Sequence, residues 1–217
     1  MKPKAAVSWS GGKDSCAALH RVRNDYEIVA AVTMFTEDGS RSRSHGLRPE
    51  VIAAQLERMG LQSIMERCTW STYDRAFEEA LAQAAVLGVT HVIFGDILFD
   101  EHREWAEARC AAHGLTAVEP LWRIPTSQLY REFLQLGGRA RIVTVRSSEL
   151  DESYLGRELV PEMLDDLTAL GVDPCGENGE YHTVVVDCPA FSRPLSVRPG
   201  ARAVNSGCIA EDLLLDD

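Results

Sequence analysis

Six consecutive residues near the start of the chain have the side chains and backbone freedom that bind phosphate. They are, in order, Ser10, Gly11, Gly12, Lys13, Asp14 and Ser15. Glycine lacks a Cβ, so backbone N–H groups in the Gly-Gly pair can approach an anion closely. The lysine adds a full positive charge, and the two serine hydroxyls add hydrogen-bond donors. The segment therefore indicates a binding site for phosphate groups.

The elements that flank this segment are those that such a site needs. An apolar run over residues 5–9 precedes it, and a helical pattern begins with Lys13–Ser15. A helix N-terminus offers unpaired N–H groups and the positive end of the helix dipole. We predict a strand, a glycine turn and a helix start, and an ordinary turn is the alternative. The common P-loop pattern is excluded, because Asp14 stands where Ser or Thr is required.

Composition limits the classes of protein to consider. The chain has 217 residues, 45% of them hydrophobic and 25% charged, which is typical of a globular protein with one large or two small domains. A net charge of −11 argues against non-specific nucleic-acid binding. No apolar run is long enough for a membrane helix, and no signal-like segment is visible, so we expect a cytoplasmic protein without membrane association.

Cysteine spacing gives no metal or redox motif. The six cysteines are Cys16, Cys68, Cys110, Cys175, Cys188 and Cys208. None forms a C-x-x-C pair, so neither a zinc ribbon nor a dithiol motif is predicted. We expect reduced and mostly buried thiols.

Alternating strand and helix patterns predict an α/β fold. Apolar runs over residues 5–9, 27–35, 61–68, 91–96 and 116–120 alternate with helical patterns, which favours a doubly wound, Rossmann-like sheet of five parallel strands. Ligands bind at the carboxyl ends of such strands. There the sequence places Gly95 and Asp96, and a polar loop that contains His45. The basic cluster of Arg41, Arg43, His45 and Arg48 is compatible with a local pocket for a nucleotide, and the alternative is a solvated loop.

The pattern changes near residue 125, where we predict a domain boundary. Residues 1–125 would form the first domain, and residues 126–217 a smaller α+β domain. Residues 173–183 combine glycine and asparagine with the carboxylates of Glu177 and Glu180, which fits either an exposed turn or a small polar site. No element is predicted after Arg198.

Five motifs occur in one order along the chain, and together they resemble the diphthine–ammonia ligase family. The Ser10–Ser15 segment alone is similar to the pyrophosphate-binding loop of the N-type ATP pyrophosphatases, within the adenine nucleotide alpha hydrolase-like superfamily. The motifs are Ser10–Ser15, Gly95–Ile97, Pro120–Trp122, Leu150–Arg157 and Gly176–Thr183. The resemblance covers about residues 4–195.

The resemblance implies a ligase that activates a carboxylate with ATP, releases pyrophosphate and lets ammonia displace AMP. It implies Mg²⁺ bound mainly through the phosphates, with Asp14 as a protein ligand. The alternative for Asp14 is a structural role, as an acid in the first turn of a helix that the helix dipole stabilises. In the family the carboxylate belongs to diphthine, a modified histidine of an elongation factor. Free ammonium is the expected nitrogen source, because no glutaminase domain is present.

Residue roles follow from the resemblance and the predicted fold. Lys13, Asp14, Glu177 and Glu180 are the expected catalytic residues. ATP is expected to contact the six-residue loop together with Ser8, Thr33, Met34, Phe35, His45, Gly95 and Asp96, with the backbone of residues 33–35 at the adenine edge. The acceptor is expected to contact Asn178, Gly179, Tyr181, Thr183 and Asp151.

Two other functional hypotheses remain open from the sequence alone. In the first, the same activation serves a sulfur donor or a small carboxylic acid, although the absence of a cysteine pair makes sulfur transfer less favoured. In the second, the chain is a nucleotide-binding protein that senses ATP without turnover. A homodimer is compatible with either.

Overall fold

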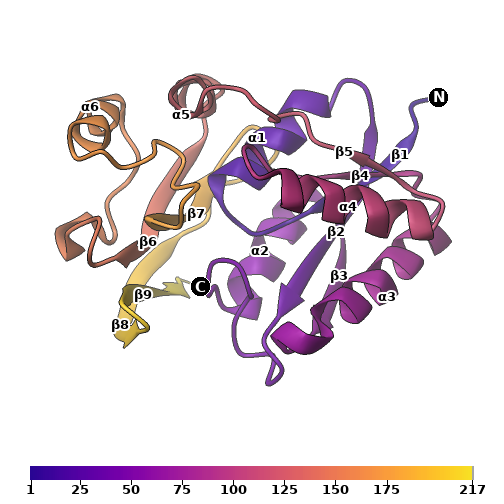
Figure 1. The fold of residues 1–217 in the computed structure, drawn as a ribbon, viewed down its shortest axis with the longest axis horizontal. Helices are drawn as coiled ribbons and strands as arrows, with labels where there is room; N and C mark the ends of the chain where they lie inside the picture. Colours follow the sequence, from indigo (N-terminus) through magenta and orange to yellow (C-terminus); the bar gives the residue numbers. More distant parts are fainter. Residues whose placement is uncertain (217) are drawn as a thin grey trace.

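The computed structural model, which describes residues 1–216, contains two β-sheets with helices packed around the first (Figure 1). The first sheet is parallel throughout, in the order β3-β2-β1-β4-β5. Its strands are β1 (Lys4–Ser8), β2 (Glu27–Phe35), β3 (Gln62–Arg67), β4 (His91–Ile93) and β5 (Thr116–Val118). The predicted doubly wound sheet of five parallel strands is confirmed.

Helices cover both faces of this sheet. They are α1 (Lys13–Val22), α2 (Pro49–Met59), α3 (Tyr73–Val86) and α4 (Asp100–Ala112). Side chains of a strand alternate between faces, and β1 shows this: Ala5 and Val7 join the core with α1 and α2, whereas Ala6 joins the core with α3 and α4. No helix among residues 1–216 is long and apolar enough to cross a bilayer.

The strand order sets the position of a ligand site. Strands β1 and β4 are neighbours at the centre, and the connections that leave them run to opposite edges of the sheet. Such a switch point leaves a crevice at the carboxyl ends of the two strands. Ser8 ends β1 at this crevice, and Gly95 lies just beyond the end of β4.

The second sheet is antiparallel, in the order β7-β6-β9-β8. It is formed by β6 (Arg139–Arg146), β7 (Tyr181–Asp187), β8 (Val197–Asn205) and β9 (Cys208–Leu215), and it is accompanied by α5 (Thr126–Gln135), α6 (Pro161–Ala169) and the short 3-10 helix η2 (Glu152–Tyr154). A second 3-10 helix, η1 (Trp70–Thr72), lies between β3 and α3 beside the first sheet. The tail after Arg198 carried little signal in the sequence, and here β8 and β9 form a hairpin. Most of β8 is exposed, so it has no apolar alternation that would reveal it.

The C-terminal hairpin also explains the basic cluster in the loop after β2. Asp212 of β9 accepts hydrogen bonds from Arg41 Nη2 at 3.1 Å and from Arg48 Nη2 at 2.6 Å. Arg43 donates to the carbonyl of Cys68 instead. The cluster therefore joins the loop to its neighbours rather than lying free in solvent.

Candidate nucleotide and acceptor site

A buried polar network fixes the shape of the phosphate loop. The Gly11 carbonyl accepts hydrogen bonds from the Val185 N–H of β7 at 2.8 Å and from Gln55 Nε2 at 3.0 Å. Gln55 also donates to the Val185 carbonyl and accepts from Trp9 Nε1, both at 2.8 Å. The Lys13 N–H donates to Thr183 Oγ1 at 3.1 Å. Because buried polar groups are costly when unpaired, this network ties the loop to the second sheet.

Lys13 is the charged centre of the site, and its side chain is only 3% exposed. Its Nζ donates to both carboxylate oxygens of Asp14, at 3.0 and 2.7 Å, and to the Cys175 carbonyl. Burial disfavours the charged form, but the Asp14 carboxylate, together with Cys175 and Tyr181, outweighs it and raises the pKa of Lys13 well above its ordinary value. Lys13 is therefore a permanent cation that contacts both the loop and the segment 173–183.

A cleft of about 540 Å³ lies at the carboxyl ends of β1 and β4. This volume is within the range of about 300–1,000 Å³ that small-molecule sites occupy. Eight of the predicted residues line it: Ser8, Ser10, Asp14, Ser15, His45, Gly95, Asp96 and Glu177. An adjoining hollow of about 160 Å³ shares five of these and adds Lys13, Gly179, Tyr181 and Thr183. The structure thus brings predicted residues from both ends of the chain together.

Residues 33–35 do not reach this cleft. They pair with β3 inside the sheet, and Thr33 Oγ1 donates to the Trp9 carbonyl at 2.7 Å. The Met34 and Phe35 carbonyls accept from Arg43 and Cys68. The backbone predicted to read adenine is therefore already hydrogen-bonded. Asp151 is also elsewhere: it is exposed and caps η2 by accepting from Ser153 N–H at 2.8 Å.

Glu180 braces the loop instead of facing the cleft. Its carboxylate accepts from the N–H groups of Asp173 and Asn178, at 3.1 and 3.0 Å, and from Asn178 Nδ2 at 3.0 Å. Burial opposes the charge, but these hydrogen bonds hold the pKa of Glu180 below its ordinary value. The sequence placed Glu180 among catalytic residues and Asn178 at the acceptor, whereas neither lines the cleft or the hollow.

Glu177 is the acidic side chain of that segment that does line the cleft. Burial, together with the nearby charge of Asp14, raises the pKa of Glu177 to about 8. Burial also raises the pKa of Asp96, which lines the same cleft. A carboxyl group with a pKa near neutrality can exchange a proton with a substrate at physiological pH.

Two stacked histidines close one side of the site without adding charge. The His45 and His182 rings lie 4.8 Å apart, and His45 Nδ1 donates to the Thr183 carbonyl at 2.6 Å. Burial lowers the pKa of His45 to about 4, and burial with repulsion from His45 and Lys13 lowers that of His182 to about 3. The rings are therefore neutral at pH 7, and Nε2 of His45 remains an acceptor.

Four aromatic residues form a wall of the cleft that sequence reasoning missed. Trp70, Tyr73, Phe94 and Trp105 line the cleft. Trp70 is 71% exposed and stacks on Tyr73 with 5.8 Å between ring centres, and Arg43 lies 4.8 Å from the Trp70 ring. These residues come from η1, α3, α4 and the segment after β4, so spacing along the chain gave no signal. A tryptophan shortly after a predicted strand end was the available hint.

Gly95 is required because β4 ends against the start of α1. A Cβ at this position would lie 2.9 Å from the Ser15 nitrogen and 3.0 Å from the Asp14 carbonyl carbon. We expect Gly95→Ala to push the helix start away and to weaken ATP binding at least about tenfold, which is about 1.4 kcal/mol. Titration calorimetry measures this. Gly114→Ala, where a Cβ meets open space, should lower stability but leave ATP affinity intact; equal affinity in both variants would contradict the packing argument.

The oxygen donors of the cleft fit Mg²⁺. This ion prefers carboxylates and phosphate oxygens, and Asp14 and Asp96 both line the cleft. Both carboxylates raise the pKa of Glu177, which lines the same cleft.

Comparisons with known proteins find matches along most of the chain. Two family models match: Diphthamide synthase N-terminal domain over residues 3–117 and Diphthamide synthase C-terminal domain over residues 125–208. The chain is 32% identical to a diphthine–ammonia ligase of Schizosaccharomyces pombe, over 85% of this chain and 34% of that protein. It is 27% identical to that of Rattus norvegicus and 24% identical to that of Homo sapiens, each over 94% of this chain and 86% of the relative.

The lengths differ among these relatives. The chain spans about a third of the fission yeast protein but most of the rat and human proteins. Since the N-terminal family model alone matches more than half of the chain and a second model follows it in order, the chain belongs to the diphthamide synthase family.

Proposed function

We propose that this chain is an ATP-dependent carbon–nitrogen ligase that turns a carboxylate into an amide, with AMP and pyrophosphate as products. One observation carries the proposal: Glu177 shares a cleft with the phosphate loop that begins at Ser10. The relatives named diphthine–ammonia ligase support diphthine on an elongation factor as the acceptor. A small carboxylic acid is the alternative acceptor.

The first step needs stabilised negative charge. A carboxylate oxygen attacks the α-phosphorus, the bond to the α–β bridging oxygen breaks, and pyrophosphate leaves with both electrons. Lys13 supplies a fixed positive charge for that step, and the hydroxyls of Ser10 and Ser15, which line the cleft, can rotate to donate to the phosphates. Fixed charges and donors in a site sheltered from water contribute most to such catalysis. Mg²⁺ held by Asp14 and Asp96 would supply further charge neutralisation on the phosphates.

The second step needs a proton acceptor. Ammonia attacks the acyl carbon, the bond to the AMP oxygen breaks, and the nitrogen loses a proton to give the amide. Glu177 is the group proposed to take a proton from ammonium or from the attacking nitrogen, because its raised pKa suits proton transfer near pH 7 to 8. Lys13, whose pKa is raised, stays charged throughout.

We further propose that the two parts of the chain have different roles. We assign nucleotide binding to residues 1–125 and acceptor binding to residues 126–217. The adenine is proposed to stack on the wall of Trp70 and Tyr73, which replaces the predicted contact with residues 33–35. Tyr181 and Thr183, in the hollow next to Lys13, are proposed to contact the acceptor.

Product analysis tests this function. The chain is incubated with ATP, Mg²⁺, ammonium and an elongation factor that carries diphthine, and nucleotides and acceptor mass are followed. We expect AMP and pyrophosphate in equal amounts and conversion of the acceptor acid to the amide. Product from a sulfur donor in place of ammonium would refute the amide assignment, and ATP binding without turnover for every acceptor would favour a sensor.

A further inference from the structure

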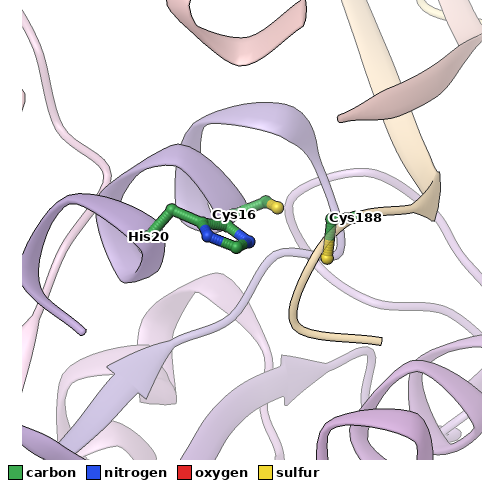
Figure 2. Close-up of side chains that lie close together, drawn as sticks. All are labelled: Cys16, His20 and Cys188. Atoms are coloured by element: carbon green, nitrogen blue, oxygen red, sulfur yellow. The ribbon is translucent and has the colours of Figure 1, made fainter. Parts of the chain in front are cut away.

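Three side chains with metal-binding atoms meet on the far side of α1 from the cleft described above. Cys16 and His20 are four residues apart on α1, so they project from the same face of the helix. Cys188 follows directly after β7. One ligand atom from each residue lies within 4.8 Å of the others. Figure 2 shows both sulfur atoms and the outer nitrogen of the His20 ring turned toward one space.

His20 provides a second, independent sign of a ligand. Its side chain is 9% exposed, yet its Nε2 has no hydrogen-bond partner among residues 1–216. A buried polar atom without a partner is unusual and costs free energy. Its Nδ1 accepts from Arg23 Nη1 at 3.2 Å. Arg23 is exposed, so it can turn to solvent when a bound metal shifts the ring proton to Nδ1.

The donor set selects the metal. Two cysteine sulfurs and one imidazole are ligands typical of Zn²⁺. Two thiolates neutralise the double charge of Zn²⁺, and a neutral cluster suits a buried position. Zn–S bonds of about 2.3 Å place tetrahedral sulfurs about 3.8 Å apart, and Zn–N bonds of about 2.0 Å place the nitrogen about 3.5 Å from each sulfur. Because the ligand atoms lie within 4.8 Å of one another, each pair needs to approach by on the order of 1 Å at most.

The site also has a route for a fourth ligand. His20 and Arg23 line a second cavity of about 230 Å³, between α1 and α5. Water entering from this cavity can complete a tetrahedron, as in zinc sites with three protein ligands.

We propose that Cys16, His20 and Cys188 bind one Zn²⁺ ion that joins helix α1 to the end of strand β7. The join matters for the nucleotide site, because α1 begins with the phosphate loop and β7 holds that loop through Thr183 and Val185. The ion is a structural link across the two sheets, separate from the Mg²⁺ expected in the cleft.

Metal titration of the reduced 217-residue chain tests this proposal. After treatment with a chelator, Co²⁺ is added as a spectroscopic probe and then Zn²⁺. We expect one equivalent of Co²⁺ with a thiolate-to-metal charge-transfer band, displaced by Zn²⁺. A Zn²⁺ concentration about 100 times its Kd should raise the Tm by roughly 5–10 °C.

Single substitutions decide where the metal binds. Cys16→Ala, Cys188→Ala and His20→Gln should each lose the charge-transfer band and the rise in Tm, while circular dichroism reports whether each variant folds. Cys110→Ala removes an equally buried cysteine outside the cluster and should keep both, and Arg23→Ala should bind at least as tightly as the parent chain. Absence of metal binding by the reduced chain would overturn the proposal. So would a Cys16–Cys188 disulfide that forms in air while the reduced chain binds no metal. Unchanged binding in the folded His20 or Cys188 variant would also overturn it.

Discussion

Replacing Lys13 by methionine is expected to reduce pyrophosphate release by about 10²–10³-fold or more. Lys13 Nζ is buried beside Asp14 and the Cys175 carbonyl, where water cannot replace its charge. Loss of one fixed donor to a developing anion typically costs this much in kcat. Pyrophosphate release at saturating ATP and acceptor measures the effect.

The Lys13→Met variant should still fold. Methionine has a similar length and no charge, and exchange of a buried ionic group for an apolar one is often tolerated. Asp14 keeps access to solvent, with 21% of its side chain exposed, so it can be hydrated. Lys2→Met, at an exposed lysine, is the matched control and should keep full activity. Undiminished release by a folded Lys13→Met chain would show that the loop has been assigned wrongly.

Glu177→Gln is expected to block amide formation while ATP still binds. Below pH 8 the active carboxylate fraction of the parent chain should grow with pH, because its pKa is about 8. Its kcat should therefore rise and level off near that pH, and the variant should be about 10²–10⁴-fold slower. Any rise that persists in the variant reports the deprotonation of ammonium itself.

Stability gives Glu177 a readout that does not depend on activity. Its folded pKa is raised, so the folded state binds more protons than the unfolded state between pH 4.5 and 8. The free energy of unfolding then falls as pH rises through this window. Glu177→Gln should be more stable than the parent chain at pH 9, by on the order of 1 kcal/mol, and the difference should shrink toward pH 5.

Glu180→Gln is the matched control, three residues along in the same loop. Its carboxylate accepts hydrogen bonds from Asp173 and Asn178, so the variant should lose about 1–3 kcal/mol of stability at pH 7 yet keep the rise of kcat toward pH 8. If Glu180→Gln lost that rise and Glu177→Gln kept it, the roles of the two acids would have to be exchanged.

The local part of the site could be predicted from sequence. The phosphate loop and Gly95 follow apolar runs directly, and parallel strands place their carboxyl ends at one edge. Short-range pattern was therefore enough to bring Ser10, Asp14 and Asp96 into one cleft. The order of motifs also related Glu177 to the loop, through the family resemblance rather than through spacing.

The remainder depended on tertiary contacts that no local pattern encodes. Glu177 and Glu180 have the same chemistry and are three residues apart, and only the turn between them decides which one meets the cleft. Cys16 and Cys188 are 172 positions apart, and they meet because β7 packs on α1. Trp70 follows a strand end in a segment without periodicity, so its place in the wall was hidden in the sequence.

Transfer of labelled oxygen tests the central claim, that a carboxylate is adenylated in this cleft, most directly. The acceptor carboxylate is labelled with ¹⁸O, and the nucleotide product of a complete reaction with ATP and ammonium is examined by mass spectrometry. Adenylation predicts one ¹⁸O atom in AMP for each amide formed, because the carboxylate oxygen that attacks the α-phosphorus stays with AMP. Unlabelled AMP, or label in inorganic phosphate formed with ADP, would contradict the account.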